Sequence, residues 1–254
     1  GEAFSLLGPC SANWYHTLID QLSLVPRWIA GGLKDRGVKL LMPAYWAYRW
    51  PELPALLGID AEAIIWHGEE PLRLERLLMP IGVRVRSVSR WARATVEQNF
   101  ANPVDLQGLR TLLLSRLDPP VPGLGRRCVI DRGDGWRPAR TKYFSALSDE
   151  LVARWGFERV FMGRLKPHEQ LQVFRDSEIV VGEHGAGLAS FVAASEGTHV
   201  VEVLPVSPAE LSIHGFNYIA AALSHQRYHT LVDAPVSRTL GYIERLLGLG
   251  RDRA

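Results

Sequence analysis

Short apolar runs alternate with amphipathic segments throughout the second half of the chain. The apolar runs predict strands at 128–130, 159–162, 178–181 and 199–204. Between and after them, hydrophobic residues recur at helical spacing and predict helices at 144–155, 168–176, 188–194 and 239–249. Alternation of buried strands with helices is typical of a parallel sheet that is covered on both faces. This half is therefore predicted to be a Rossmann-like domain.

The first half shows a less regular version of the same pattern. It predicts strands at 38–42, 63–66 and 83–85, and helices at 14–28, 50–57, 88–94 and 102–117. Residues 118–125 then contain three prolines and two glycines, a composition that favours a linker over a helix or a central strand. We therefore predict an α/β protein with two Rossmann-like domains, residues 1–117 and 118–254, facing across a cleft. Ligands of such sheets bind at the carboxyl ends of the strands. The last helix could close back over either domain.

A glycine-rich turn follows the predicted strand at 178–181. Gly182, Gly185 and Gly187 surround Glu183 and His184, and a helix of small residues follows. Glycines allow a ligand to approach the backbone, and the free N–H groups at a helix start favour an anion such as a phosphate. The spacing differs from GxGxxG, and the Gly-Lys-Ser/Thr ending of a P-loop is missing, which argues against those two nucleotide sites. A tight turn that holds a hydrogen-bonded histidine is the alternative interpretation.

Composition and charge narrow the class of ligand. A hydrophobic fraction of 47% and a charged fraction of 22% are ordinary for a globular protein. Cys10 and Cys128 are too few and too far apart for a disulfide framework or a paired-cysteine metal site, and we expect both to pack as small core residues. The net charge of +2 argues against a nucleic-acid partner. The window 126–166 nevertheless holds 10 basic and 5 acidic residues. Its arginines could bind a diphosphate, with a solvated charged face as the simpler alternative for any one of them.

The first half carries its own candidate chemistry. Asn13 is a good N-cap for the predicted helix at 14–28, and His16 and Asp20 are four residues apart and share one face of it. Such a pair can act as base and orienter, or the carboxylate alone can take a proton from a hydroxyl group. An ordinary helix pair is the alternative. Five aromatic residues of this half could form a sugar platform, although core packing is the simpler interpretation. They are Trp28, Trp46, Tyr48, Trp50 and Trp91.

Neither a membrane span nor a signal peptide is expected in this sequence. No apolar run approaches the roughly 18 to 20 residues that cross a bilayer. No basic region followed by an apolar stretch opens the chain.

Taken together, these motifs resemble glycosyltransferase family 61. This family includes plant xylosyltransferases, animal O-linked N-acetylglucosaminyltransferases, and bacterial enzymes of capsule or lipopolysaccharide synthesis. Its early helix with Asn, an aromatic residue, His and an acidic residue is matched by Asn13, Tyr15, His16 and Asp20. The chain also matches a central stretch at 72–78, a strand that ends at Arg132, the Gly-x-His-Gly-Ala-Gly-Leu turn at 182–188 and the strand at 200–205.

The resemblance implies a GT-B architecture and an inverting, usually metal-independent transfer from a nucleotide sugar. No cofactor beyond this co-substrate is implied, and the acceptor would be a glycan or glycoconjugate. Asp20 would be the base, oriented by His16. The residues assigned to the donor are Arg132, Gly182, Glu183, His184, Gly185, Ala186, Gly187 and Glu202. Among them His184 and Arg132 would stabilise the leaving group, and Glu183 or Glu202 would hold ribose hydroxyls.

The bacterial relatives also imply where the protein would work. The location would be cytoplasmic, with the inner face of the membrane, reached through the acceptor, as a further option. Two other functions fit the same features. One is a sugar-nucleotide epimerase or hydrolase on the same scaffold, and the other is a catalytically inactive module that binds nucleotide sugars.

Overall fold

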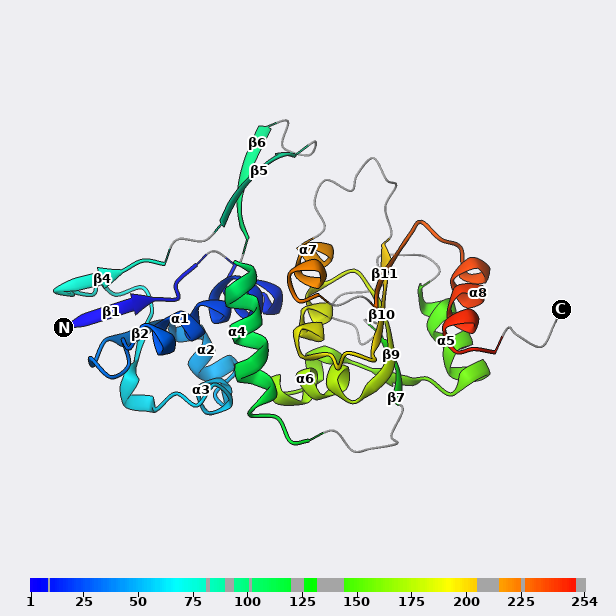
Figure 1. The fold of residues 1–254 in the computed structure, drawn as a ribbon, viewed down its shortest axis with the longest axis horizontal. Coiled ribbons are helices and arrows are strands. Elements are labelled where there is room, and N and C mark those ends of the chain that lie inside the picture. Colours follow the sequence, from blue (N-terminus) through cyan, green and yellow to red (C-terminus); the bar gives the residue numbers. More distant parts are fainter. Residues whose placement is uncertain are drawn as a thin grey trace. The chain divides into compact units, whose positions relative to one another are not determined.

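The computed structural model describes residues 1–8, 10–80, 83–89, 94–100, 102–119, 126–131, 144–204, 215–224 and 227–249 (Figure 1). The chain divides into two compact units. Unit 1 contains Gly1–Pro119, Lys166–Glu169 and Gly215–Ser224, and unit 2 contains the remaining segments, Pro120–Leu165, Gln170–His214 and His225–Ala254. Each unit has its own parallel sheet, of four and of five strands. The predicted α/β class is confirmed, and the sheets are consistent with two Rossmann-like domains.

Unit 1 is built on a sheet with the strand order β3-β2-β1-β4. Its strands are β1 (Glu2–Ser5), β2 (Lys39–Pro43), β3 (Ile64–His67) and β4 (Arg76–Leu78), and all neighbours pair in parallel. The helices are η1 (His16–Gln21), η2 (Leu22–Leu24), α1 (Val25–Ala30), α2 (Ala44–Arg49), α3 (Leu53–Leu56), η3 (Ala61–Ala63), α4 (Pro103–Leu114) and α7 (Gly215–Ala222). Trp28, Trp46 and Trp50 are buried core residues, as the simpler interpretation predicts, whereas Tyr48 is exposed. Trp91 lies outside the described residues.

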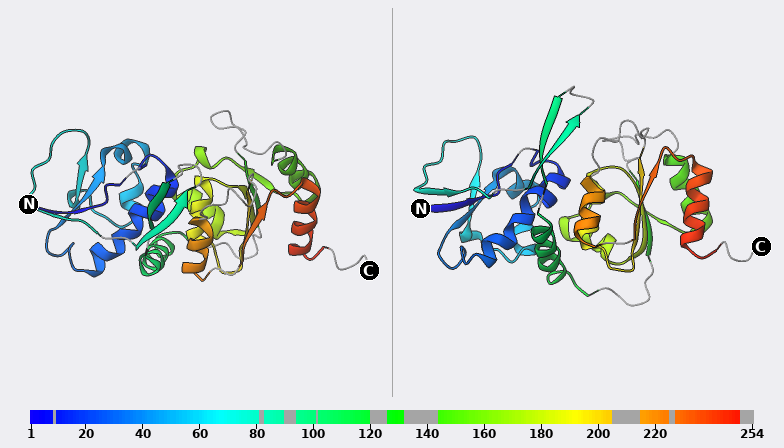
Figure 2. Two further views of the ribbon diagram at one scale, coloured as in Figure 1. Left: turned by 90° about the horizontal axis from the view of Figure 1, so that it is seen from above. Right: turned by 45° about the horizontal axis from the view of Figure 1, so that its top comes forward.

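Unit 2 is built on a sheet with the strand order β11-β10-β9-β7-β8. Its strands are β7 (Arg126–Ile130), β8 (Glu158–Val160), β9 (Ser177–Glu183), β10 (His199–Leu204) and β11 (Tyr228–Val232), all pairing in parallel. Its helices are α5 (Phe144–Trp155), η4 (Met162–Arg164), α6 (Pro167–Arg175), whose first turn belongs to unit 1, η5 (Ala186–Ala193) and α8 (Val236–Leu246). Helices α5 and α8 cover one face of the sheet and α6 lies on the other (Figures 1 and 2).

The hydrophobic core of unit 2 shows which side chains of β10 point toward helices α5 and α8 and which point to the opposite face of the sheet. Val201 and Val203 belong to the cluster that also contains Leu147 and Leu151 of α5 and Ile243 of α8. Successive residues of a strand point to opposite faces. Glu202, between these two valines, therefore points to the face away from α5 and α8.

Several elements differ from the predicted local structure. The helix predicted at 88–94 is replaced by an antiparallel hairpin of β5 (Val83–Ser89) and β6 (Ala94–Phe100). Val83 and Val85 alternate with Arg84 and Arg86, and this period-two pattern favours a strand that continues beyond the one predicted at 83–85. The helix predicted at 188–194 is a 3₁₀ helix that begins earlier. Strands β1, β4 and β11 and helices α2 and α7 were not predicted.

Two further expectations can be compared with the described residues. Cys128 is buried as predicted, and burial raises the pKa of its thiol, but Cys10 is exposed because it lies in the loop before η1. None of the helices in the described parts of the chain is long and apolar enough to cross a membrane. Most of the predicted linker at 118–125 lies outside the described residues, so the domain boundary between 117 and 118 stays a prediction.

Candidate functional site

The strand order marks one position in each sheet where ligands of Rossmann-like domains bind. In unit 2 the chain runs from β7 outward to β8 and then returns past β7 to β9, so the order reverses between β7 and β9. In unit 1 the corresponding reversal lies between β1 and β4. Ligands of open parallel sheets bind outside the carboxyl ends of the strands at such a switch point. His184 directly follows β9, and His16 and Asp20 lie in the first helix after β1.

His184 is held by a buried carboxylate at the end of β9. Its Nδ1 lies 2.5 Å from Oε1 of Glu202, and the hydroxyl group of Tyr228 donates to the other carboxylate oxygen of Glu202 at 2.8 Å. The side chain of Glu202 is fully buried, whereas 32% of the His184 side chain is exposed. A buried carboxylate is stabilised when donors reach both of its oxygens. The contact through Nδ1 fixes the orientation of the His184 ring at the end of β9.

This arrangement changes the role expected for Glu202. The sequence resemblance suggested a contact with ribose hydroxyls, but both carboxylate oxygens are engaged by protein side chains. We therefore treat Glu202 as a positioning residue for His184. Glu183, the last residue of β9, is also buried and makes further contacts within the protein.

The backbone after His184 has the features of an anion site. Gly185 is extended, with φ 168° and ψ 170°, and η5 begins at Ala186. The N–H of Leu188 donates to the carbonyl oxygen of Gly185, the first bond of the helix. The N–H groups of Ala186 and Gly187 precede that bond and have no acceptor within the helix. Such N–H groups favour a negatively charged oxygen.

Two glycines of the motif pack closely against side chains inside the protein. A Cβ atom on Gly182 would lie 2.8 Å from Cδ2 of Leu188, and one on Gly187 would lie 3.2 Å from Cγ of Met162. Both glycines also lie close to the side chain of Ile130 at the end of β7. Their absent side chains allow η5 to pack closely against the carboxyl ends of β7 and β9.

Gly182→Ala is expected to lower the free energy of unfolding by about 1 to 3 kcal/mol, because the added methyl group overpacks the contact with Leu188. Urea unfolding monitored by circular dichroism would measure the change. Gly163→Ala is the matched control, since its Cβ would meet no heavy atom within 4 Å, and it should change the stability by less than about 0.5 kcal/mol. Equal stability of the two variants would contradict this packing role.

The structure describes only part of the basic window, and four of its described arginines form ion pairs within unit 2. Arg132 and its neighbours up to residue 143 lie outside the described residues. Asp131, directly before Arg132, is buried and accepts hydrogen bonds from Ser148 and Arg159. The end of β7 is therefore firmly anchored. The other ion pairs described in the window join Arg126 to Glu158, Arg127 to Glu178, Arg154 to Glu150 and Arg159 to Asp149.

His16 and Asp20 form a direct contact on the first helix of unit 1. Nδ1 of His16 lies 2.6 Å from Oδ2 of Asp20, and both side chains are about one-third exposed, at 35% and 31%. The prediction that they share one face is confirmed. The contact through Nδ1 leaves Nε2 of His16 as the nitrogen that can exchange a proton or contact a ligand.

The local sequence explains why this pair is well positioned. The side-chain oxygen of Asn13 accepts a hydrogen bond from the N–H of Tyr15, which confirms its predicted capping role. The backbone carbonyl of Ser11 accepts hydrogen bonds from the hydroxyl of Thr17 and the indole of Trp46. Residues His16–Gln21 adopt a π-helix, a wide turn that is frequent at functional sites.

Tyr228 is a residue that the sequence reasoning missed. It opens β11, which pairs with β10 so that Tyr228 lies opposite Val200. Tyr228, Thr230 and Val232 occupy every second position of this segment, and that spacing is the signal that could have indicated the strand. Within the part of the chain that the structure describes, no group of three or more His, Cys, Asp or Glu residues could hold a metal ion.

Comparison with known proteins adds one finding to this geometry. A family model described as Glycosyltransferase 61 matches residues 14–201, a span that includes both histidine clusters except Tyr228 and Glu202. No curated protein matches the chain at a significant level.

Proposed function

Because the chain belongs to glycosyltransferase family 61, we propose that it transfers a sugar from a nucleoside-diphosphate donor to a hydroxyl group of a glycan or glycoconjugate, with inversion at the anomeric carbon. In this proposal residues 1–117 and 118–254 form two Rossmann-like domains of GT-B type facing across a cleft. The second domain binds the donor, and the first supplies the base. The observation that carries the proposal is the pair of histidine–carboxylate contacts, one at the end of β9 and one in the first helix after β1.

On the donor side, the leaving diphosphate is the group that needs stabilisation. The N–H groups of Ala186 and Gly187 and the side chain of Arg132 would bind its oxygens, with Gly185 allowing the close approach. His184 would stabilise the charge that develops on the diphosphate, while Glu202 holds the ring through Nδ1. Donors that are already oriented toward developing charge lower the barrier effectively.

On the acceptor side, His16 and Asp20 act as a unit. The acceptor hydroxyl attacks the anomeric carbon opposite to the diphosphate, a bond to its oxygen forms, and the bond to the diphosphate oxygen breaks. The hydroxyl proton passes to Nε2 of His16, and Asp20 holds the ring and stabilises the imidazolium. This modifies the sequence expectation, which made Asp20 the base, because a carboxylate that contacts Nδ1 orients the imidazole and can stabilise the ring after it accepts a proton.

Donor binding can be tested by thermal unfolding in the presence of UDP, GDP, ADP or dTDP. One of these diphosphates is expected to stabilise the protein by about 2.7 kcal/mol when present at 100 times its dissociation constant. Gly185→Val should remove the stabilisation, because a branched side chain would occupy the approach to the N–H groups. Gly197→Val, at an exposed turn of the same unit, should retain it.

The results distinguish a wrong donor from a wrong location of the diphosphate site. If no diphosphate stabilises the protein, the donor proposal is wrong. If Gly185→Val binds as well as the native protein, the diphosphate site lies elsewhere. The role in capsule or lipopolysaccharide synthesis, the cytoplasmic location at the membrane face and the independence from metal ions stay predictions from the sequence resemblance.

A further inference from the structure

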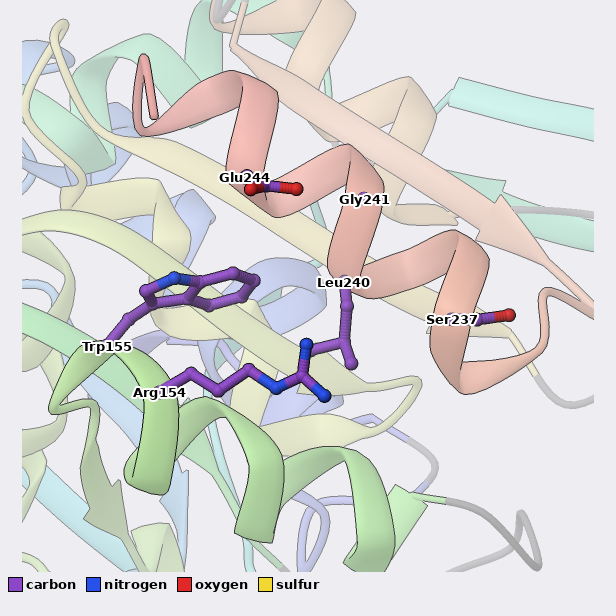
Figure 3. Close-up of a pocket in the computed structure, with 6 residues that line it drawn as sticks. All are labelled: Arg154, Trp155, Ser237, Leu240, Gly241 and Glu244. Atoms are coloured by element: carbon purple, nitrogen blue, oxygen red, sulfur yellow. The ribbon is translucent and has the colours of Figure 1, made fainter. Parts of the chain in front are cut away.

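A groove of about 490 Å³ lies between α5 and α8 of unit 2. Its lining residues are Arg154, Trp155, Ser237, Leu240, Gly241 and Glu244 (Figure 3). Because Val201 and Val203 face these helices while Glu202 faces the opposite layer, the groove and the His184 cluster lie on opposite faces of the five-stranded sheet. It is therefore separate from the proposed donor site.

Trp155 supplies a supported aromatic surface in this groove. Its ring extends from the end of α5 into the space beside Glu244 and Leu240 (Figure 3). The side chain packs against the hydrophobic core and remains partly exposed, so the core supports the ring while part of it stays accessible. Its indole N–H donates to no acceptor among the described residues. An aromatic side chain with an accessible N–H can bind a ligand that has both an apolar surface and hydrogen-bonding groups.

The polar groups of the groove carry balanced charge. Arg154 is held by Glu150 one turn earlier, with Nε 2.5 Å from the carboxylate. Glu244 forms no ion pair within the described segments, and Ser237 adds an exposed hydroxyl group. With one guanidinium and one carboxylate at its walls, the groove lacks the excess positive charge that a phosphate, a nucleotide or an anionic membrane surface would favour. It offers donors and acceptors to an uncharged, hydroxyl-rich ligand.

Gly241 keeps the α8 side of the groove open. A Cβ atom at this position would meet only Nη1 of Arg245, at 3.9 Å. Glycine within a helix costs about 1 kcal/mol relative to alanine. Because space for a side chain is present, packing does not require glycine at this position of α8. The open space lies next to Trp155 and Glu244, where a ring could be seated.

We propose that this groove binds a neutral oligosaccharide, with one sugar ring stacked on Trp155 and its hydroxyl groups bonded to Glu244, Arg154 and Ser237. Sugar rings present an apolar C–H face together with hydroxyl groups that donate and accept, which matches this lining. The proposal rests on family membership and is independent of the roles proposed for His16, Asp20 and His184. Binding a glycan chain at a second place would raise its effective concentration at the transfer site.

A glycan array of neutral oligosaccharides, followed by calorimetry with the strongest ligand, tests the proposal. The native protein is expected to bind at least one oligosaccharide, and Gly241→Phe should weaken that binding at least tenfold by filling the groove. Glu244→Ala should weaken it by removing the acceptor. Arg238→Phe is the matched control, because it places the same ring on an exposed position of α8 that does not line the groove, and it should bind as the native protein does.

Three results would overturn the proposal. They are no binding to any oligosaccharide, binding that Gly241→Phe leaves unchanged, and a concentration-dependent dimer that Gly241→Phe abolishes, which would make the groove an interface between copies. Donor stabilisation and transfer to a short acceptor should be the same in Gly241→Phe and the native protein. Failure of the glycan proposal therefore differs from failure of the proposed function, which would appear as lost diphosphate binding or absent transfer.

Discussion

Asp20→Asn is expected to lower kcat of transfer by roughly 10²- to 10⁴-fold, the range in which a positioned general base contributes to catalysis. The amide cannot stabilise an imidazolium at His16, and it can also favour the wrong tautomer of the ring. Dissociation constants for the donor diphosphate should stay within about twofold of the native value, because Asp20 lies in unit 1, outside the proposed donor site. Initial rates and calorimetry on the same preparations would measure both quantities.

Further variants show how the proton is handled. His16→Gln should lose as much activity as Asp20→Asn, and the double variant should be no slower than either, because groups that act as a unit are not additive. Asp35→Asn makes the same change at an exposed position of unit 1 and should leave kcat unchanged. Full activity of His16→Gln would return the base role to Asp20. Full activity of Asp20→Asn would show that the His16–Asp20 pair has no role in catalysis. Absence of transfer by the native protein would favour the alternative of a catalytically inactive module that binds nucleotide sugars.

His184→Ala is expected to lower kcat by roughly 10²- to 10³-fold, the typical loss when one donor to a developing negative charge is removed. Glu202→Gln should lower it by about 10- to 100-fold, as is usual when the partner that orients a functional histidine is changed. If Glu202 acts through His184, the second variant should also shift the pH dependence of kcat. His199→Ala, on the same strand but directed to the other face, should change kcat by less than about twofold and serves as the control.

Tyr228→Phe separates two roles of Tyr228, the hydrogen bond that positions Glu202 and the packing of its ring. The ring still packs against Phe191, with centroids 4.9 Å apart in the native protein, but the hydrogen bond to Glu202 is lost. A small loss of kcat with an altered pH profile is expected. If Glu202→Gln and Tyr228→Phe lower stability and leave both kcat and its pH profile unchanged, the buried carboxylate has only a structural role.

Much of the fold was predictable because its segments follow one clear period. The strand at 199–204 and the helix at 144–155 have strong apolar patterns, and both were predicted with the correct bounds. Strands β1 and β4 were not predicted, because three or four residues are too few to show a repeating pattern of apolar positions. The hairpin of β5 and β6 was not predicted because the alternation of Val83 and Val85 with arginines stops at Ser87.

The candidate sites were predictable in residue type but only partly in role. Sequence spacing was sufficient to place His16 beside Asp20, because residues four positions apart lie on the same face of a helix. The partner of His184 could not be found this way, because Glu202 lies 18 residues away and is brought close by strand pairing. The glycines at 182 and 187 were assigned to a ligand, and in the structure their missing Cβ atoms also leave room for the side chains of Leu188 and Met162. Spacing does not distinguish an approaching ligand from an approaching side chain.

Unit 1 is assembled from three separate segments of the chain, and this limits which fragments of the protein can be expressed alone. Its helix α7 comes from residues far beyond the proline-rich segment, and the side chain of Gln107 in α4 donates to the carbonyl of Ala222 in α7 at 2.8 Å. A fragment that ends at residue 117 would lack α7 and leave part of α4 uncovered. The two halves are therefore poor candidates for separate expression. A chimera that exchanges donor specificity with a relative would have to keep residues 166–169 and 215–224 from the parent of unit 1.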